Sequence, residues 1–163
     1  MKINNFLCSL CIVLLLLGST KMNAQSIKKT FDTHTSDCVV EFDIAPTAPW
    51  QDINIRPATE GNDKNTRILL KGGGKVQLFN SKKIADNFTY KMDGTKYNFK
   101  VSLYFKNLKT PLVTVEAKEA TADDWIVLFE KETQISKMPV GMLEVLGKKT
   151  AALHLSNVRI EKL

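Results

Sequence analysis

The chain has 163 residues, a net charge of +6 and 25% charged residues, a composition typical of a globular protein. Its lysines are spread among acidic residues, whereas nucleic-acid-binding proteins gather positive charge in one stripe, so no nucleic-acid partner is expected. The sequence contains neither a Gly-x-Ser-x-Gly nucleophile motif nor histidines at metal-ligand spacing.

Residues 1–24 predict a signal peptide. Lys2 precedes an apolar run from Phe6 to Leu17, which is shorter than the ~20 residues that span a bilayer. We expect cleavage after the small residue Ala24, with an uncleaved anchor as the less favoured alternative. Residues 25–163 would then form a secreted β-sandwich domain, periplasmic or extracellular and at the cell surface, with no membrane span. Without the two lysines of the signal segment, its charge is about +4.

Cysteine usage excludes a disulfide framework. Cys38 is the one cysteine left after residue 24, so no intramolecular disulfide can form and packing must supply the stability. Because Cys38 precedes Val39 and Val40, we interpret it as a small buried residue at the start of a strand.

The first half of the chain predicts short strands separated by turns. Apolar residues alternate with polar ones over 37–44 and 52–56, and two prolines break the pattern between these strands. Residues 66–71 and 75–80 flank Gly72-Gly73-Gly74, which can adopt positive φ, so they predict a hairpin. A further short strand is expected over 88–92.

The clearest strand runs from Lys96 to Lys106. Its apolar residues share one parity and its mostly polar residues the other, because side chains alternate across a sheet. The apolar set is Tyr97, Phe99, Val101, Leu103 and Phe105. This pattern predicts a half-buried antiparallel strand.

The remaining chain also predicts strands. Residues 112–117 follow a turn, the continuous apolar run 125–129 predicts a strand covered on both faces, and 142–146 is ambiguous between strand and helical turn. Residues 151–163 change their apolar face at Ser156-Asn157, which predicts a β-bulge. With no convincing helix, the fold class is all-β, an antiparallel β-sandwich.

Four segments in order carry a resemblance to a known family. They are Val40-Glu-Phe-Asp-Ile-Ala-Pro, Lys71-Gly-Gly-Gly-Lys-Val-Gln, Gly94-Thr-Lys-Tyr-Asn-Phe-Lys-Val and Leu155-Ser-Asn-Val-Arg-Ile-Glu-Lys-Leu. This order resembles the concanavalin A-like lectin and glucanase superfamily, especially its laminin-G-like members. The resemblance implies a jelly-roll whose concave face or rim loops often bind carbohydrate, sometimes with calcium. We therefore expect a non-catalytic recognition module for polysaccharide or glycoconjugate.

Two alternatives stay open. Laminarinase-like members of the superfamily use Glu-x-Asp-x-x-Glu, in which paired carboxylates divide the acid/base and nucleophile roles. Glu41 and Asp43 match the first two positions, but Pro46 stands at the third. A glycan hydrolase or lyase is therefore the first alternative, and a structural or protein-binding component of the cell envelope is the second.

Sugar sites combine an aromatic platform with polar side chains that fix the hydroxyl groups. Trp50 is the first candidate because it lies in a proline-containing loop, whereas Trp125 begins an apolar run and is expected in the core. Asp52 is a candidate because it lies close to Trp50 in sequence, and Lys100 and Tyr104 because they share the polar parity of the 96–106 strand. Arg56 and Gln77 are candidates for the same orientation on neighbouring strands, whose order one sequence does not give.

No resident cofactor is predicted. Calcium remains a candidate ligand, because carboxylate oxygens are its preferred partners in proteins. Asp32, Asp37 or the adjacent Asp123 and Asp124 could supply such oxygens.

Overall fold

The computed structural model describes residues 26–30, 37–57, 66–79, 81–107, 110–133, 142–148 and 150–163. The predicted signal peptide (1–24) and Asp32 lie outside these residues, so both stay predictions. Among the described helices, none has the length and apolar character needed to cross a bilayer.

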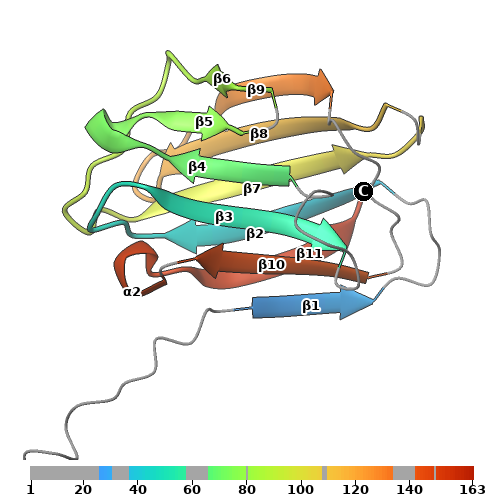
Figure 1. Ribbon diagram of the computed structural model, residues 1–163, viewed down its shortest axis with the longest axis horizontal. Coiled ribbons are helices and arrows are strands. Elements are labelled where there is room, and N and C mark those ends of the chain that lie inside the picture. Colours follow the sequence, from blue (N-terminus) through green and yellow to red (C-terminus); the bar gives the residue numbers. More distant parts are fainter. Residues whose placement is uncertain are drawn as a thin grey trace, which may run out of the picture.

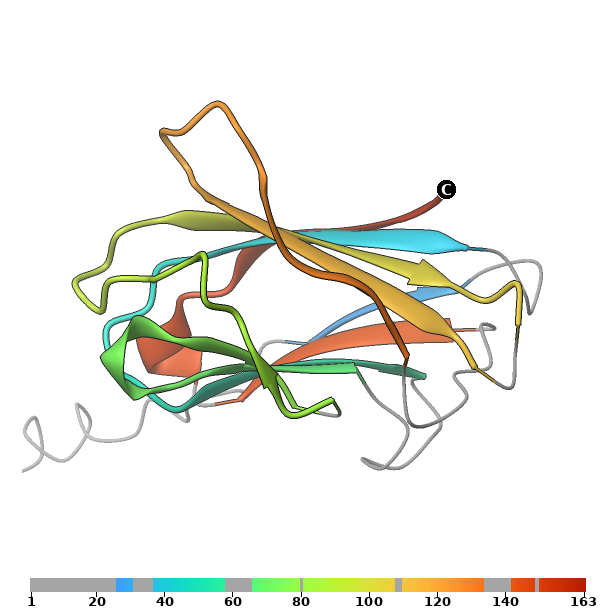
Figure 2. The ribbon, with the colours of Figure 1, turned by 90° about the horizontal axis from the view of Figure 1, so that it is seen from above.

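The described strands form two antiparallel sheets, which Figures 1 and 2 show as two stacked layers. The six-stranded sheet has the order β1 (Ser26–Thr30), β10 (Met142–Lys148), β3 (Gln51–Pro57), β4 (Thr66–Leu70), β5 (Val76–Leu78) and β6 (Lys83–Ile84). The five-stranded sheet has the order β11 (Ser156–Lys162), β2 (Cys38–Ile44), β7 (Tyr97–Tyr104), β8 (Leu112–Glu119) and β9 (Ile126–Thr133). The predicted all-β antiparallel jelly-roll sandwich is confirmed.

The core lies between the sheets, and β7 crosses it as predicted. All five apolar residues of the predicted stripe are at most 2% exposed. Phe99 stacks on Phe42 of β2 with the ring centroids 5.5 Å apart, and Phe88 meets Phe99 edge-on. Cys38 is buried with a free thiol, and burial, helped by Asp37, raises its pKa to about 12. Its predicted role as a small core residue is confirmed.

The glycine hairpin is also confirmed. Strands β4 and β5 pair antiparallel around the short 3-10 turn η1 (Gly72–Gly74), in which Gly73 and Gly74 have φ of 69° and 72°. A β-carbon on Gly74 would collide with the carbonyl oxygen of Tyr90, so glycine is required there for space as well as for conformation.

Several sequence predictions differ from the structure. Residues 88–92 form no strand, although Phe88 and Tyr90 are buried, and β10 resolves the ambiguous segment as a strand. The last predicted strand begins later than expected, because the single-turn helix α2 (Thr150–Leu153) precedes it. The bulge is confirmed: the register shifts between Ser156 and Arg159, and Asn157 has a φ of 51°.

Strand β9 corrects another prediction. Leu128 and Phe129 are buried, but Ile126 and Val127 are 37% and 43% exposed. The strand is therefore not covered on both faces. It lies at the edge of the five-stranded sheet and its register with β8 shifts, so its apolar residues do not all face the core.

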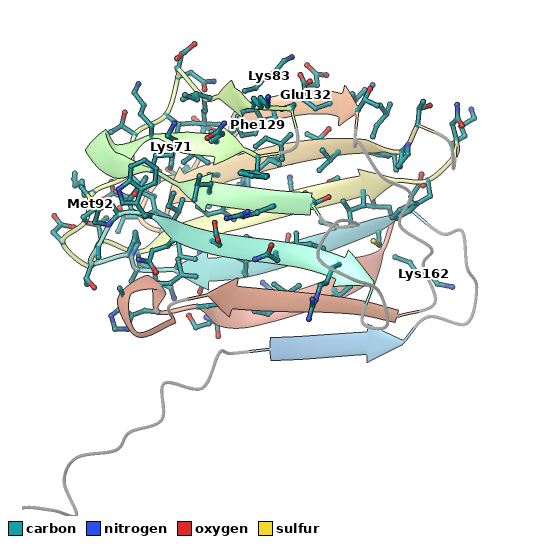
Figure 3. The ribbon with its side chains drawn as sticks, viewed as in Figure 1. Lys71, Lys83, Met92, Phe129, Glu132 and Lys162 are labelled. Carbon is teal, nitrogen blue, oxygen red and sulfur yellow. The ribbon has the colours of Figure 1, made fainter. Side chains whose placement is uncertain are left out.

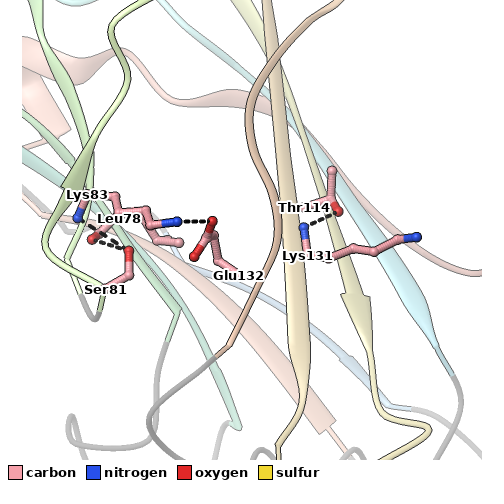
Figure 4. A network of polar contacts seen from close by, with 6 residues as sticks. All are labelled: Leu78, Ser81, Lys83, Thr114, Lys131 and Glu132. Carbon is pink, nitrogen blue, oxygen red and sulfur yellow. Dashed lines mark hydrogen bonds and ion pairs between the residues drawn. The ribbon is translucent and has the colours of Figure 1, made fainter.

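Polar contacts join the two sheets at the β6 and β9 edges (Figure 4). The ammonium group of Lys83 lies 2.5 Å from a carboxylate oxygen of Glu132, and the side chain of Asn87 donates a hydrogen bond to the carbonyl of Val127. Neither of these edge strands pairs with a further described strand, so these contacts bind the layers together at this side of the sandwich.

Candidate functional site

Four of the six predicted ligand-binding residues lie at the outer face of the six-stranded sheet. Ile53 and Ile55 of β3 point into the core, so Asp52 and Arg56 point outward. Gln77 lies in the same row as Asp52, with Leu69 between them on β4. Trp50 immediately precedes β3, and its ring lies near the ammonium group of Lys71. We call this surface the Trp50 face; its members are Trp50, Asp52, Arg56, Arg67, Leu69, Lys71, Lys75, Gln77 and Phe79.

Trp50 is held in an unusual position. Its side chain is 54% exposed, and its φ of 63° is in the left-handed region that bulky residues rarely adopt. Its backbone N–H donates a hydrogen bond of 2.7 Å to the carbonyl of Leu70, and the ammonium group of Lys71 lies 5.9 Å from the ring centroid. Gly72 leaves room beside the indole. Neither core packing nor backbone preference therefore accounts for a tryptophan at this position.

A second aromatic residue lies farther along the same face. The guanidinium group of Arg67 donates two hydrogen bonds to the carboxylate of Asp52, of 3.1 and 2.7 Å, and its carbon lies 4.2 Å from the ring centroid of Phe79. Phe79 is 45% exposed. The Trp50 face thus carries two exposed aromatic rings with fixed polar groups between them.

The sequence analysis missed Arg67 and Phe79, although the sequence contains a signal for both. Ile68 and Leu70 face the core, so the alternation of β4 turns Arg67 outward. The glycine hairpin sets a register in which Phe79 lies opposite Arg67, and the N–H of Phe79 donates to the Arg67 carbonyl. Combining hairpin register with alternation would have found the pair.

The other two predicted residues lie on the opposite side of the sandwich. Lys100 and Tyr104 belong to β7, and their side chains are on the outer face of the five-stranded sheet. Lys100 forms an ion pair of 2.7 Å with Glu116 and lies 4.9 Å from the ring centroid of Trp125. Arg56 and Gln77 therefore do not share the orientation of Lys100 and Tyr104, because β3 and β5 belong to one layer and β7 to the other.

Trp125 is a partly exposed residue rather than a core residue. Lys100 and Lys118 both approach its ring, and Lys118 also donates to the carbonyl of Ala122. Figure 2 shows the connection between β8 and β9 projecting outward from the five-stranded sheet. The contacts of Trp125 therefore hold this projecting connection against its own sheet.

The carboxylates Glu41 and Asp43 are engaged in contacts within the five-stranded sheet. Glu41 lies 3.4 Å from Arg159, whereas Asp43 accepts hydrogen bonds from the side chains of Asn98 and Asn157 and pairs with Lys96. Burial acts to raise the pKa of Asp43, but these hydrogen bonds outweigh it and the pKa lies below its usual value. Both carboxylates are thus engaged with neighbouring side chains of their own sheet.

The acidic residues considered for calcium are dispersed in the described part of the chain. The carboxylate of Asp37 accepts a hydrogen bond of 2.7 Å from the N–H of Phe105. No group of three or more His, Cys, Asp or Glu side chains suited to a metal ion occurs among the described residues.

The fold and site together define a jelly-roll β-sandwich with an aromatic, polar face on its six-stranded sheet. No protein-family model and no curated protein matches the chain. Among solved structures, it is similar to a marine alginate lyase from Aplysia kurodai, with a TM-score of 0.47, 9% identity and coverage of 89% of this chain and 86% of the other. A toad ovary galectin in complex with thio-digalactose gives a TM-score of 0.44, 12% identity and coverage of 85% and 99%. Sheep galectin-11 gives a TM-score of 0.43 and 15% identity, with coverage of 85% of this chain and 97% of the galectin. Similarities of this size do not bear on function, so the site rests on the residues of this chain.

Proposed function

We propose that the protein is a secreted, non-catalytic recognition module that binds polysaccharide or glycoconjugate on the Trp50 face. The observation that carries this proposal is the exposed indole of Trp50 in a left-handed backbone conformation. Strained backbone that the surrounding structure holds in place is concentrated at ligand-binding and active sites. An exposed aromatic ring is the surface on which the apolar side of a pyranose stacks.

The surrounding polar groups supply the second part of a sugar site. The hydrogen bonds between Arg67 and Asp52 fix both side chains, so their remaining donor and acceptor positions are oriented before a ligand arrives. Gln77 adds an amide that can both donate and accept. Phe79, with Arg67 over its ring, adds a second exposed aromatic side chain, so the Trp50 face suits an extended chain of sugars better than a single ring.

A glycan panel tests this proposal. The purified protein would be assayed for binding with calcium and with chelator, while the same samples are assayed for new reducing or unsaturated sugar ends. We expect binding without product, and loss of binding in Trp50→Ala but not in Trp125→Phe. Product formation would instead establish a hydrolase or lyase. Absence of binding to every glycan in the panel would overturn the proposal.

One observation favours a protein partner as the second candidate. Ile84 on β6 and Ile126 and Val127 on β9 are large apolar residues at least 37% exposed, at the side of the sandwich where the sheet edges meet. An envelope component could use this edge for contact with another protein. Pull-down with an edge variant such as Val127→Lys would separate this role from glycan binding.

A further inference from the structure

We infer that the Trp50 face recognises an anionic glycan, one bearing carboxylate or sulfate groups, through the ammonium groups of Lys71 and Lys75. This inference rests on the proposed function and names its ligand class. It comes from a row of three residues at the end of β3, β4 and β5, where Lys71 is labelled in Figure 3.

Backbone hydrogen bonds align this row. The N–H of Trp50 donates to the carbonyl of Leu70, and the N–H of Lys71 donates to the carbonyl of Lys75 at 2.8 Å. Leu70 and Val76 are fully buried, so alternation places Lys71 and Lys75 outward, on the same side as Trp50. Adjacent strands lie ~4.8 Å apart, so the row extends for about 10 Å across the sheet.

The charge of this row is not compensated by described residues. Some lysines elsewhere in the described chain form ion pairs, such as Lys96 with Asp43 and Lys100 with Glu116, whereas others, such as Lys106 and Lys118, have no carboxylate partner among the described residues. The ammonium of Lys71 instead faces the Trp50 ring, and no ion pair joins Lys71 or Lys75 to a described carboxylate. The charge of Arg67 is balanced by Asp52, so the excess positive charge of this part of the face lies on the two lysines.

An acidic sugar fits this arrangement better than a neutral one. Its ring can stack on the indole while its carboxylate or sulfate reaches an ammonium group, which is a charge-assisted contact. A neutral sugar can accept hydrogen bonds from the ammonium groups, but it gains no charge–charge attraction. Because both groups are at the surface, the attraction weakens within a Debye length of ~10 Å at 0.1 M salt, and binding should depend on ionic strength.

The test compares matched polymers that differ in charge. The probes are polygalacturonate against its methyl-esterified form, and dextran sulfate against dextran, with affinity measured by calorimetry at 0.05 and 0.3 M salt. We expect the charged member of at least one pair to bind more tightly. In the double variant Lys71→Gln/Lys75→Gln its affinity should fall by about tenfold, because two surface ammonium groups no longer attract the polymer. The control is Lys106→Gln, which replaces an exposed lysine just after β7. This variant should leave the affinity for the charged polymer unchanged.

The outcomes separate the two proposals. A preference for the charged member that depends on both lysines and weakens with salt supports the inference, and the pair that shows it distinguishes carboxylate from sulfate. Equal binding of charged and neutral members, lost in Trp50→Ala but not in the lysine variants, overturns the inference and leaves the proposed function standing. Tighter binding of polyuridylate than of any polysaccharide would also overturn it. Binding of no glycan would remove both proposals.

Discussion

Arg67 on β4 lies with its guanidinium carbon 4.2 Å from the ring centroid of Phe79, the residue opposite it across the β4–β5 hairpin. The same guanidinium makes two hydrogen bonds to Asp52 on β3. One side chain thus links three strands on the outer face of the six-stranded sheet. It fixes an aromatic ring and a carboxylate relative to each other without help from the core.

Arg67→Lys tests this linkage. Lysine keeps the charge but has neither the planar fork for two parallel hydrogen bonds nor the flat surface that stacks on a ring. We expect a loss of about 1 kcal/mol in the free energy of unfolding, measured by urea denaturation, because exposed cation–π and bidentate interactions have this magnitude. An unchanged midpoint in Arg67→Lys would show that the linkage contributes nothing to stability.

Trp50→Asn separates function from stability. Asparagine tolerates the left-handed conformation, and releasing a bulky residue from it recovers ~1–2 kcal/mol, which offsets the removal of the indole packed beside Gly72. The free energy of unfolding should therefore stay within about 1 kcal/mol of the parent while glycan binding is abolished. A destabilisation well beyond that, with binding retained, would assign Trp50 a structural role.

Adjacent glycines provide a matched pair of variants. Gly73 and Gly74 both have positive φ, but a β-carbon on Gly73 meets nothing within 4 Å, whereas one on Gly74 meets the backbone of Tyr90. We expect Gly73→Ala to cost about 1 kcal/mol, the conformational penalty alone. Gly74→Ala should cost clearly more, because backbone atoms must move. Equal unfolding midpoints for the two variants would contradict the close approach of these segments.

Asp43 predicts a stability change at acid pH. Its pKa is lowered in the folded protein, so its contribution is present above the unfolded pKa of ~3.9 and is lost as the pH falls through the folded value. Asp43→Asn should cost about 2 kcal/mol at pH 7, since it removes hydrogen bonds to a charged group, and much less near pH 2. The exposed Asp86→Asn is the control. Urea titrations at several pH values would show a constant difference if Asp43 were not responsible.

Much of the fold could be predicted, because alternation reports directly on burial. The parity of the 96–106 segment identified five core residues, and the change of face at Ser156-Asn157 identified the bulge. The burial of β9 was predicted wrongly, because an apolar run in an edge strand has the same composition as one in a central strand. Residues 151–153 were predicted as strand because the four residues of α2 are too few to show a helical period.

The candidate site could be predicted only in part. Parity showed that Asp52 and Arg56 point the same way, but it could not show which sheet each strand joins. Lys100 and Tyr104 were therefore grouped with residues of the opposite layer. The role of Arg67 depends on a register across two hairpin strands, and the left-handed conformation of Trp50 depends on tertiary structure, neither of which a single segment reveals.

The most direct measurement uses the two tryptophans of the chain as reporters. In Trp125→Phe the fluorescence comes from Trp50 alone, and in Trp50→Phe it comes from Trp125 alone. Each variant would be titrated with acrylamide, with and without a saturating glycan from the panel. We predict that the glycan shields Trp50 from quenching and leaves Trp125 unchanged. If the glycan instead shielded Trp125 from acrylamide and left Trp50 accessible to it, this result would contradict a glycan site on the Trp50 face.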